Sequence, residues 1–158
     1  MGLGRALLAG SVGGTVGSVL MWGLFTTATR VGWLSERPPE RVIDRASAAV
    51  GEATEAAGPV EPAERTTAAV SSHLLFGAGA GAFYGFVQDE LDLPPLLTGV
   101  AYGFAIWIAA YVGVLPAVRI LPEPWRQRPG DALVPVAAHA IFGLSLGVIE
   151  PRISRRKD

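Results

Sequence analysis

Charged and uncharged stretches alternate along the chain, and the uncharged ones are long. Asp, Glu, Lys and Arg are absent from residues 6–29, 66–88, 93–118 and 132–149. A helix needs about 20 consecutive apolar residues to cross the hydrocarbon core of a bilayer, whereas a soluble helix carries polar residues along its exposed face. The pattern therefore predicts an all-α fold, an integral membrane four-helix bundle. The spans are expected at about residues 3–33, 63–87, 96–120 and 131–150.

The segment between the first two predicted spans has a helical pattern of its own. Val42, Ile43 and Ala46 recur at helical spacing, with charged residues between them. This predicts a short extramembrane amphipathic helix over about residues 40–57. Because its apolar stripe is mostly alanine, we expect it to pack on the bundle as a lid rather than to enter the membrane deeply. We expect residues 1–158 to form a single membrane domain.

Prolines and an aspartate are expected to shape the ends of the last two spans. Pro116 has no backbone N–H, so it should bend the last turns of the third span. Asp131 is a candidate N-cap for the fourth span. The pair Glu150-Pro151 is expected to end that span before the basic tail.

The spans contain an internal repeat. The second and fourth share the pattern H-x-[LI]-F-G-x-x-x-G, from His73 to Gly81 and from His139 to Gly147. The first and third share a weaker pattern, from Leu7 to Gly14 and from Leu96 to Gly103. This order predicts a tandem duplication of a two-helix unit. Since each unit has an even number of spans, the two copies should be related by a pseudo-twofold axis along the membrane normal.

Glycines at four-residue spacing are expected to pack the helices together. Little hydrophobic force acts between helices in lipid, so small residues that allow close backbone approach drive their association. The predicted packing glycines are Gly10, Gly14, Gly77, Gly81, Gly99, Gly103, Gly143 and Gly147. A glycine ridge left exposed in the folded chain would indicate a partner. The leading interpretation is a non-enzymatic membrane protein that associates with itself or serves as an accessory subunit of a larger complex.

His73 and His139 are the only histidines, and each lies four residues before a packing glycine. Ionisable groups inside a span are candidate functional residues, although a neutral imidazole can also simply bond across helices. One functional alternative is a small transporter, or a proton or solute relay, that uses the paired imidazoles. Another is a b-type haem held by both histidines as its only metal ligands. A hydrated cavity that reaches both rings would favour the transport interpretation.

Composition and the lack of catalytic motifs argue against several classes of function. The chain has no cysteine, which excludes disulfides and thiolate metal sites. Its net charge of −1 and the lack of a large basic patch argue against nucleic acid as a partner. No nucleophile, metalloprotease or phosphate-loop motif is present, so we predict no catalytic residues and no enzymatic activity. The expected partners are the lipid bilayer and a homo-oligomer or larger membrane complex.

The expected location is a prokaryotic inner membrane, crossed several times. Twelve of the thirteen basic residues are arginine, and Ala and Gly are abundant, as in high-GC genomes. Four spans place both termini on the same side. Eight basic residues flank the loop side and five the terminal side, which favours a cytoplasmic long loop. The dense basic tail favours the opposite orientation, so the side of the termini stays open.

The order of these features resembles a family of small multi-span bacterial inner-membrane proteins of unknown function typified by YagU. The similar segments are the glycine-rich first span (LLAGSVGGTVGSVLMW), the arginine-rich helix (PPERVIDRA) and the His-led second span (HLLFGAGAGAFYG). They continue with the third span (GVAYGFAIWIAAYVGVLPA) and the His-led fourth (HAIFGLSLG). The resemblance implies a membrane location and several spans. It implies no reaction and no catalytic residues.

Overall fold

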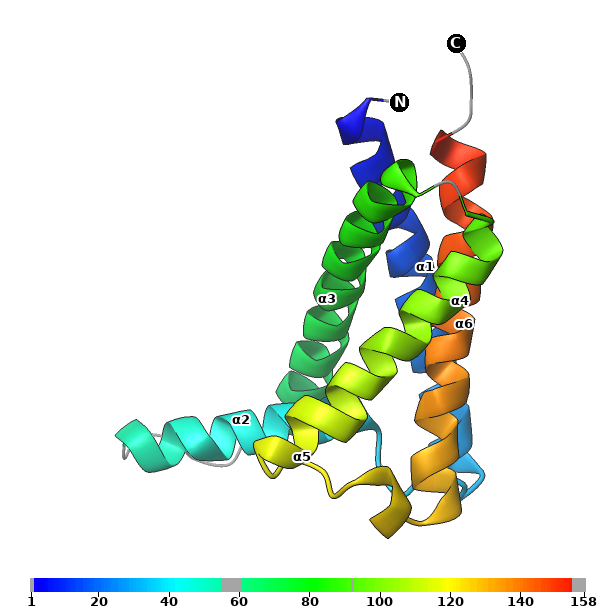
Figure 1. Ribbon diagram of the computed structural model, residues 1–158. Coiled ribbons are helices and arrows are strands. Elements are labelled where there is room, and N and C mark those ends of the chain that lie inside the picture. Colours follow the sequence, from blue (N-terminus) through cyan, green and yellow to red (C-terminus); the bar gives the residue numbers. More distant parts are fainter. Residues whose placement is uncertain (1, 55–60, 92, 155–158) are drawn as a thin grey trace.

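The computed structural model describes residues 2–54, 61–91 and 93–154, and every regular element in these ranges is helical. Within them, four helical stretches are long and apolar enough to cross a membrane. The predicted all-α class and four spanning-length helices are thus confirmed. The stretches are α1 (Leu3–Arg30), α3 (Pro62–Glu90), the third span (Pro95–Ala117) and α6 (Pro129–Ser154). The start of α1 and the end of α6 lie at the same end of the bundle (Figure 1).

The helix between the first two spans is α2, which runs from Pro38 to Thr54. It begins two residues before its predicted start, because proline is well suited to the first turn of a helix, where its missing N–H is not needed. The predicted last residues, 55–57, lie outside the described residues. Figure 1 shows α2 lying across the end of the bundle opposite the termini. A short 3₁₀ turn, η2 (Pro124–Arg126), lies in the connection between the third span and α6.

The third span consists of α4 (Pro95–Trp107), a π-helical segment η1 (Ile108–Val114) and α5 (Leu115–Ala117). The π-helical turns come directly before Pro116, whose ring and missing N–H disturb the regular α-helical ladder. The span ends three residues before its predicted end at residue 120. There the backbone reverses at Arg119, which has a φ of 58°.

Helix α6 is longer than predicted at both ends. It starts at Pro129 rather than at Asp131. The Asp131 carboxylate instead accepts hydrogen bonds from the backbone N–H (2.7 Å) and the hydroxyl (2.9 Å) of Ser35, so it ties α6 to the loop after α1. At the other end α6 continues through Pro151 to Ser154. The proline lies in the last turn, where its missing donor costs a single hydrogen bond near the helix end.

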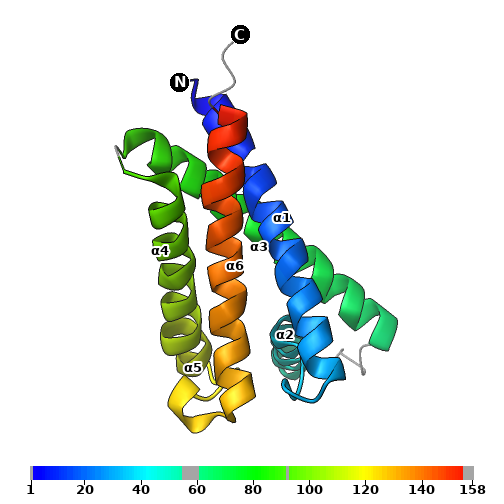
Figure 2. The same cartoon turned by 90° about the vertical axis from the view of Figure 1, so that its right-hand side faces the viewer.

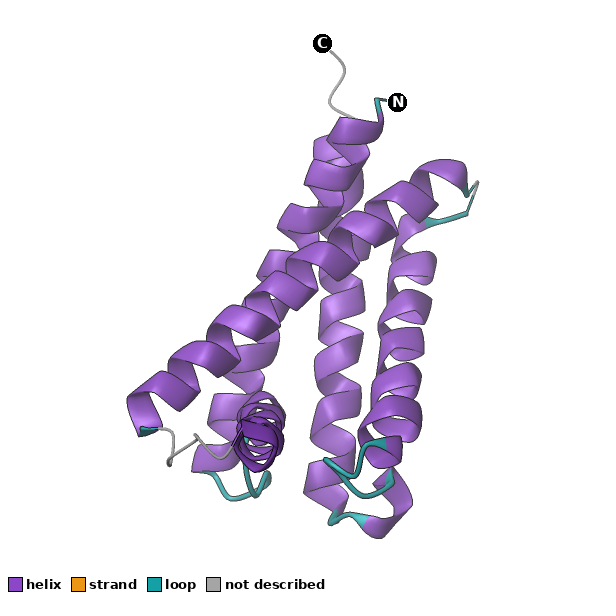
Figure 3. Cartoon of the chain, turned by 90° about the vertical axis from the view of Figure 1, so that its left-hand side faces the viewer, coloured by secondary structure: helices purple, strands orange, loops and turns teal. Residues whose placement is uncertain are grey.

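The four spans pack in the order α3, α1, α6, α4. Helix α1 packs along both α3 and α6, and α4 packs along α6; in Figure 2, α6 lies between α1 and α4. By contrast, α3 and α4 meet near their link, where the Tyr84 hydroxyl donates to the Pro95 carbonyl and the Tyr102 hydroxyl to the Ala80 carbonyl, both at 2.8 Å. From there the two helices diverge toward α2 (Figure 3).

Glycines form the closest helix contacts. A methyl group added to any of the eight predicted packing glycines would lie within 3.0 Å of an atom on a neighbouring helix of the same chain. Gly10 and Gly14 lie against Gly81 and Gly77 in the α1–α3 pair. Glycines also line the face of α1 that meets α6, where Gly17 lies against Phe142. The fold therefore depends on backbone contacts that larger residues would prevent.

The α1–α6 contact has no counterpart between α3 and α4. In the predicted duplication, Gly13 and Gly17 of α1 correspond to Tyr102 and Ile106 of the third span. Glycine allows α1 to approach α6 closely, whereas the two large side chains hold α4 away from α3. The packing therefore departs from twofold symmetry, and the duplication itself stays a prediction.

We predict that Gly81→Ala destabilises the fold by about 1–3 kcal/mol, because the new methyl group would overlap the Gly10 carbonyl. The matched control is Gly79→Ala on the same helix, since a methyl group there meets nothing within 4 Å. It should be neutral or stabilise by up to about 1 kcal/mol, because alanine favours helix more than glycine does. Reversible unfolding in mixed micelles, followed by tryptophan fluorescence, measures both changes. Equal effects of the two substitutions would contradict the tight α1–α3 contact.

Candidate functional site

The two histidines line one cavity of about 430 Å³ between the four spans. His73 comes from α3 and His139 from α6. The rest of the wall is mainly apolar and includes Met21, Phe25, Phe76, Ile106, Leu115 and Phe142. Phe76 is 63% exposed on the outer face of α3. The cavity therefore extends from the middle of the bundle to its apolar surface, on the side where α3 and α4 diverge.

His139 is held in one orientation and one protonation state at Nδ1. Only 7% of the residue is exposed, and its Nδ1 lies 2.8 Å from the carbonyl oxygen of Pro135, one turn earlier on α6. Because a carbonyl only accepts, Nδ1 must carry the proton. The Tyr111 ring packs edge-on against the imidazole, with ring centroids 5.6 Å apart. The ring nitrogen available to a ligand is therefore Nε2.

His73 lies among aromatic rings on the opposite wall. Its ring centroid is 6.5 Å from that of Trp22 and 6.2 Å from that of Phe25, both on α1. Its Nε2 is buried and has no hydrogen-bond partner among the described residues. The hydroxyl of Ser18, a residue only 1% exposed, lines the same cavity and is likewise unpartnered in the described part of the chain. Buried polar atoms normally have partners, so these two are unpaired polar points in a wall that is otherwise mainly apolar.

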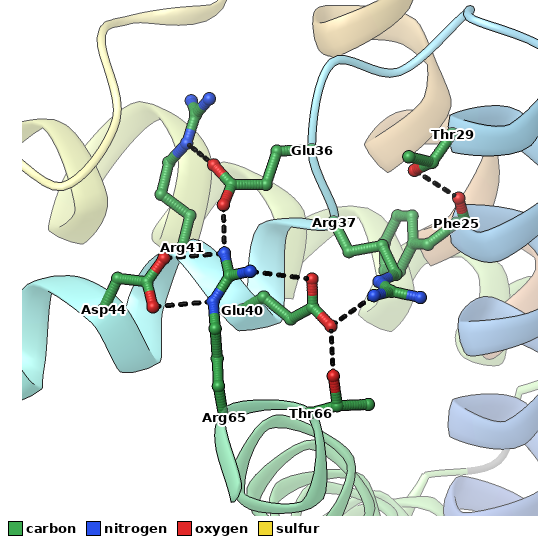
Figure 4. A network of polar contacts seen from close by, with 9 residues as sticks. All are labelled: Phe25, Thr29, Glu36, Arg37, Glu40, Arg41, Asp44, Arg65 and Thr66. Atoms are coloured by element: carbon green, nitrogen blue, oxygen red, sulfur yellow. Dashed lines mark hydrogen bonds and ion pairs between the residues drawn. The ribbon is translucent and has the colours of Figure 1, made fainter. Parts of the chain in front are cut away.

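Helix α2 covers one end of the cavity. Pro38, Pro39 and Val42 are part of the cavity wall. A charged network holds α2 against the start of α3 (Figure 4). At its centre, the guanidinium of Arg65 on α3 pairs with three carboxylates: Asp44 at 2.6 Å, Glu40 at 3.6 Å and Glu36.

Glu40 is the buried member of this network, with 3% of its side chain exposed. It accepts hydrogen bonds from Arg37 (2.5 Å) and from the hydroxyl of Thr66 (3.0 Å), besides its ion pair with Arg65. A buried carboxylate is tolerated only when it is paired in this way. Arg37 also lies 5.3 Å above the Trp22 ring. The network thus fixes the position of α2 relative to both α1 and α3.

The structure places the two histidines predicted from the sequence in one cavity. It also places other groups there that the sequence does not predict. Ser18 and Tyr111 have no sequence signal as ligand contacts. The Arg65 network has a weak one, the alternation of arginines and acids in PPERVIDRA. Among the described residues, no cluster of three or more His, Cys, Asp or Glu side chains is arranged to hold a metal ion. Haem ligation would need only the two imidazoles.

The sequence profile of one protein family, described as "Protein of unknown function (DUF1440)", matches residues 26–148. The chain belongs to this family. The DUF1440 match includes α2, both histidines and the whole of α3 and the third span. No curated protein and no solved structure matches the chain.

We predict that Arg65→Gln releases α2 from the DUF1440 bundle. The substitution leaves Glu40 buried with fewer partners, and we expect it to lower the free energy of unfolding by about 2 kcal/mol. Breaking a fully buried ion pair costs roughly 3–5 kcal/mol, and the smaller value is expected here because Arg65 is partly exposed. The chain has no cysteine, so spin labels at Ala46→Cys and Ala68→Cys can report the α2–α3 distance. Pulsed electron paramagnetic resonance should give a narrow distribution for the parent and a broad one for Arg65→Gln.

The control for this experiment is Arg126→Gln, which removes an exposed arginine whose carboxylate partner lies 3.7 Å away. Its distance distribution should match that of the parent. A narrow distribution in Arg65→Gln would show that the network does not hold α2 in place.

Proposed function

We propose that this chain is a multi-pass protein of a prokaryotic inner membrane, of the YagU-like kind, that binds a small, largely apolar molecule in the cavity between its spans. One observation carries the proposal: His73, His139 and the Ser18 hydroxyl share a cavity whose other walls are mainly apolar. Ligand sites in proteins commonly combine apolar walls with a few polar groups that orient the ligand.

The outer surface of the four spans supports the membrane location. Large apolar side chains are exposed on every span, as expected for helices that face lipid. Examples are Leu8, Leu75, Leu97, Ile108 and Leu133. The start of α1 and the end of α6 lie at one end of the bundle and α2 at the other (Figure 1); this arrangement supports the proposal that α2 is an extramembrane lid over one end of the cavity.

Binding is favoured over self-association because the predicted packing glycines face helices of the same chain. Gly10 and Gly14 contact α3, and Gly143 and Gly147 contact the third span. None of the eight is left as an exposed ridge for a second copy. The glycine pattern, which suggested a partner at the level of sequence, is therefore accounted for by the fold of one chain.

Binding is also favoured over catalysis. The Ser18 hydroxyl makes no hydrogen bond to either imidazole in the described part of the chain, and a serine nucleophile requires a base in contact with it. No carboxylate lines the cavity. A transporter or proton relay, the alternative use of the histidines, would also need a path through the terminal half of the bundle, where the spans pack backbone to backbone at Gly81 and Gly147.

A bis-histidine b-type haem is the second candidate, and the Nδ1 bond of His139 favours it. Histidine ligands of metals usually donate their other ring N–H to a carbonyl or carboxylate, as His139 does to Pro135. An absorption spectrum of the protein purified from haem-replete cells separates the two candidates. A Soret band that is lost in His139→Ala would establish haem as the ligand. A colourless protein would reject haem and favour the small apolar molecule.

We predict that Ala110→Phe fills the cavity and prevents binding. Ala110 lines the cavity, whereas its neighbour Ala109 is exposed, which makes Ala109→Phe a matched control. The probe is an uncharged alkyl diazirine in lipid nanodiscs, with labelled residues mapped by mass spectrometry. Labelling of Phe142, which is buried and lines the cavity, should fall about tenfold in Ala110→Phe and persist in Ala109→Phe. Absence of label on Phe142 in the parent protein would contradict the proposal.

A further inference from the structure

A second, charged pocket lies beside the apolar cavity. It has a volume of about 690 Å³ and lies between α2 and the segment 116–126 that follows the third span. Its charged wall contains four arginines, Arg41, Arg45, Arg119 and Arg126, and three acids, Glu36, Asp44 and Glu123. The elements that line the pocket, α2 and the segment after α5, lie at the end of the bundle opposite the start of α1 and the end of α6 (Figure 1).

The acids of this pocket are already paired. Glu36 pairs with Arg41 at 2.9 Å and also with Arg65, Asp44 pairs with Arg65 at 2.6 Å, and Glu123 lies 3.7 Å from Arg126. Within the described residues, neither Arg45 nor Arg119 makes an ion pair or a side-chain hydrogen bond. The pocket therefore holds two arginines without counterions, and it can accept an anion without displacing an existing pair.

Arg119 occupies a position where the backbone favours glycine. The Ile120 N–H bonds to the Leu115 carbonyl at 2.9 Å and the Arg119 N–H to the Pro116 carbonyl at 3.0 Å. These two bonds form a Schellman motif, whose left-handed residue is usually glycine. Here that residue is arginine, at a φ of 58°. Non-glycine residues in this conformation are strained and concentrate at functional sites, and this one adds a guanidinium to the pocket.

The charged pocket and the apolar cavity share their dividing wall. On α2, Arg41 and Arg45 face the pocket while Val42 faces the cavity; after the π-helical turns, Pro116 lines the pocket while Leu115 lines the cavity. No residue lines both spaces, so a molecule with an anionic group and an apolar chain occupies both only if its chain passes through this wall, between α2 and the end of the third span. Arginine suits such a group because its planar fork of donors matches phosphate and carboxylate oxygens.

We propose that the ligand is an anionic amphiphile, whose phosphate group binds Arg45 and Arg119 and whose apolar chain enters the cavity that the histidines line. This proposal rests on the proposed function, because it assigns the chain to that cavity. It adds the chemical class of the head group and the side of the bundle from which the ligand enters.

The test measures binding of short-chain phosphatidic acid to the full chain in an uncharged detergent by native mass spectrometry. Inorganic phosphate and a diacylglycerol with the same chains are the comparison ligands. Arg119→Gly removes the guanidinium and places the preferred residue in the left-handed position, so the fold should be at least as stable as the parent. Arg45→Gln is the second variant. Arg128→Gln, an exposed arginine of the same end that lines neither space, is the control.

We expect phosphatidic acid to bind at least about tenfold more tightly than either comparison ligand, because it alone engages both spaces. Arg119→Gly and Arg45→Gln should each weaken its binding about tenfold, and Arg128→Gln should not. Equal affinity of the parent and Arg119→Gly for phosphatidic acid would overturn the proposal. Equal affinities of phosphatidic acid and inorganic phosphate would overturn it too, since the pocket would then be a site for a soluble anion.

These failures differ from a failure of the proposed function. The diazirine probe carries no charge, so its labelling of Phe142 in the parent protein tests the cavity alone. If Phe142 is labelled but phosphatidic acid binds equally well without Arg45 or Arg119, the cavity remains a ligand site. Only the proposal that the ligand has an anionic head group is then rejected.

Discussion

Close backbone contact at glycine is the constraint on which the arrangement of the four spans depends. In hydrocarbon, helices gain little from burying apolar surface, so they associate where small residues let their backbones touch. Helix α1 has glycines on two faces: Gly10 and Gly14 meet α3, while Gly13 and Gly17 meet α6. The third span has them on one face only, against α6. Helix α1, with two glycine faces, packs between α3 and α6, and α6 packs between α1 and α4, whereas α3 and α4 are left without such a glycine contact.

The cavity exists because the third span, unlike α1, has packing glycines on only one face. Where α3 and α4 could have packed together, the third span presents Tyr102 and Ile106, and their bulk keeps the helices apart. The two histidine rings of α3 and α6 then face the same space rather than each other's backbone. The Arg65 network fixes α2 across the open end, so the shape of the cavity depends on charged contacts outside the spans as well as on glycine contacts within them.

Much of this fold could be predicted from the sequence, since a span is a local property. Twenty uncharged residues suffice to identify one, whatever their neighbours. The four-residue spacing of the glycines is also local, so the sequence predicts which glycines could pack. The sequence does not predict the identity of each partner helix, because Gly14 could face any span until the bundle is assembled. The π-helical turns before Pro116 and the left-handed Arg119 depend on local backbone geometry that spacing does not encode.

The candidate site was only half predictable. The sequence predicts His73 and His139 as candidate residues because ionisable residues are rare inside spans. It does not predict their common cavity, since this arises from a contact that α3 and α4 do not make. The pairing of Arg65 with acids more than twenty residues earlier likewise depends on how α2 folds back over α3.

The central claim is that a cavity between the spans exposes both imidazoles to molecules from the hydrocarbon region. Solid-state NMR of the protein labelled at histidine and alanine, in bilayers whose lipids carry ¹³C-labelled acyl chains, tests it most directly. The decisive ring is His139, because it is buried from the outer surface and touches the cavity. The account predicts magnetisation transfer from acyl chains to the rings of both His73 and His139, and none to the methyl group of the fully buried Ala138. A His139 ring that receives no more transfer than Ala138 would contradict it.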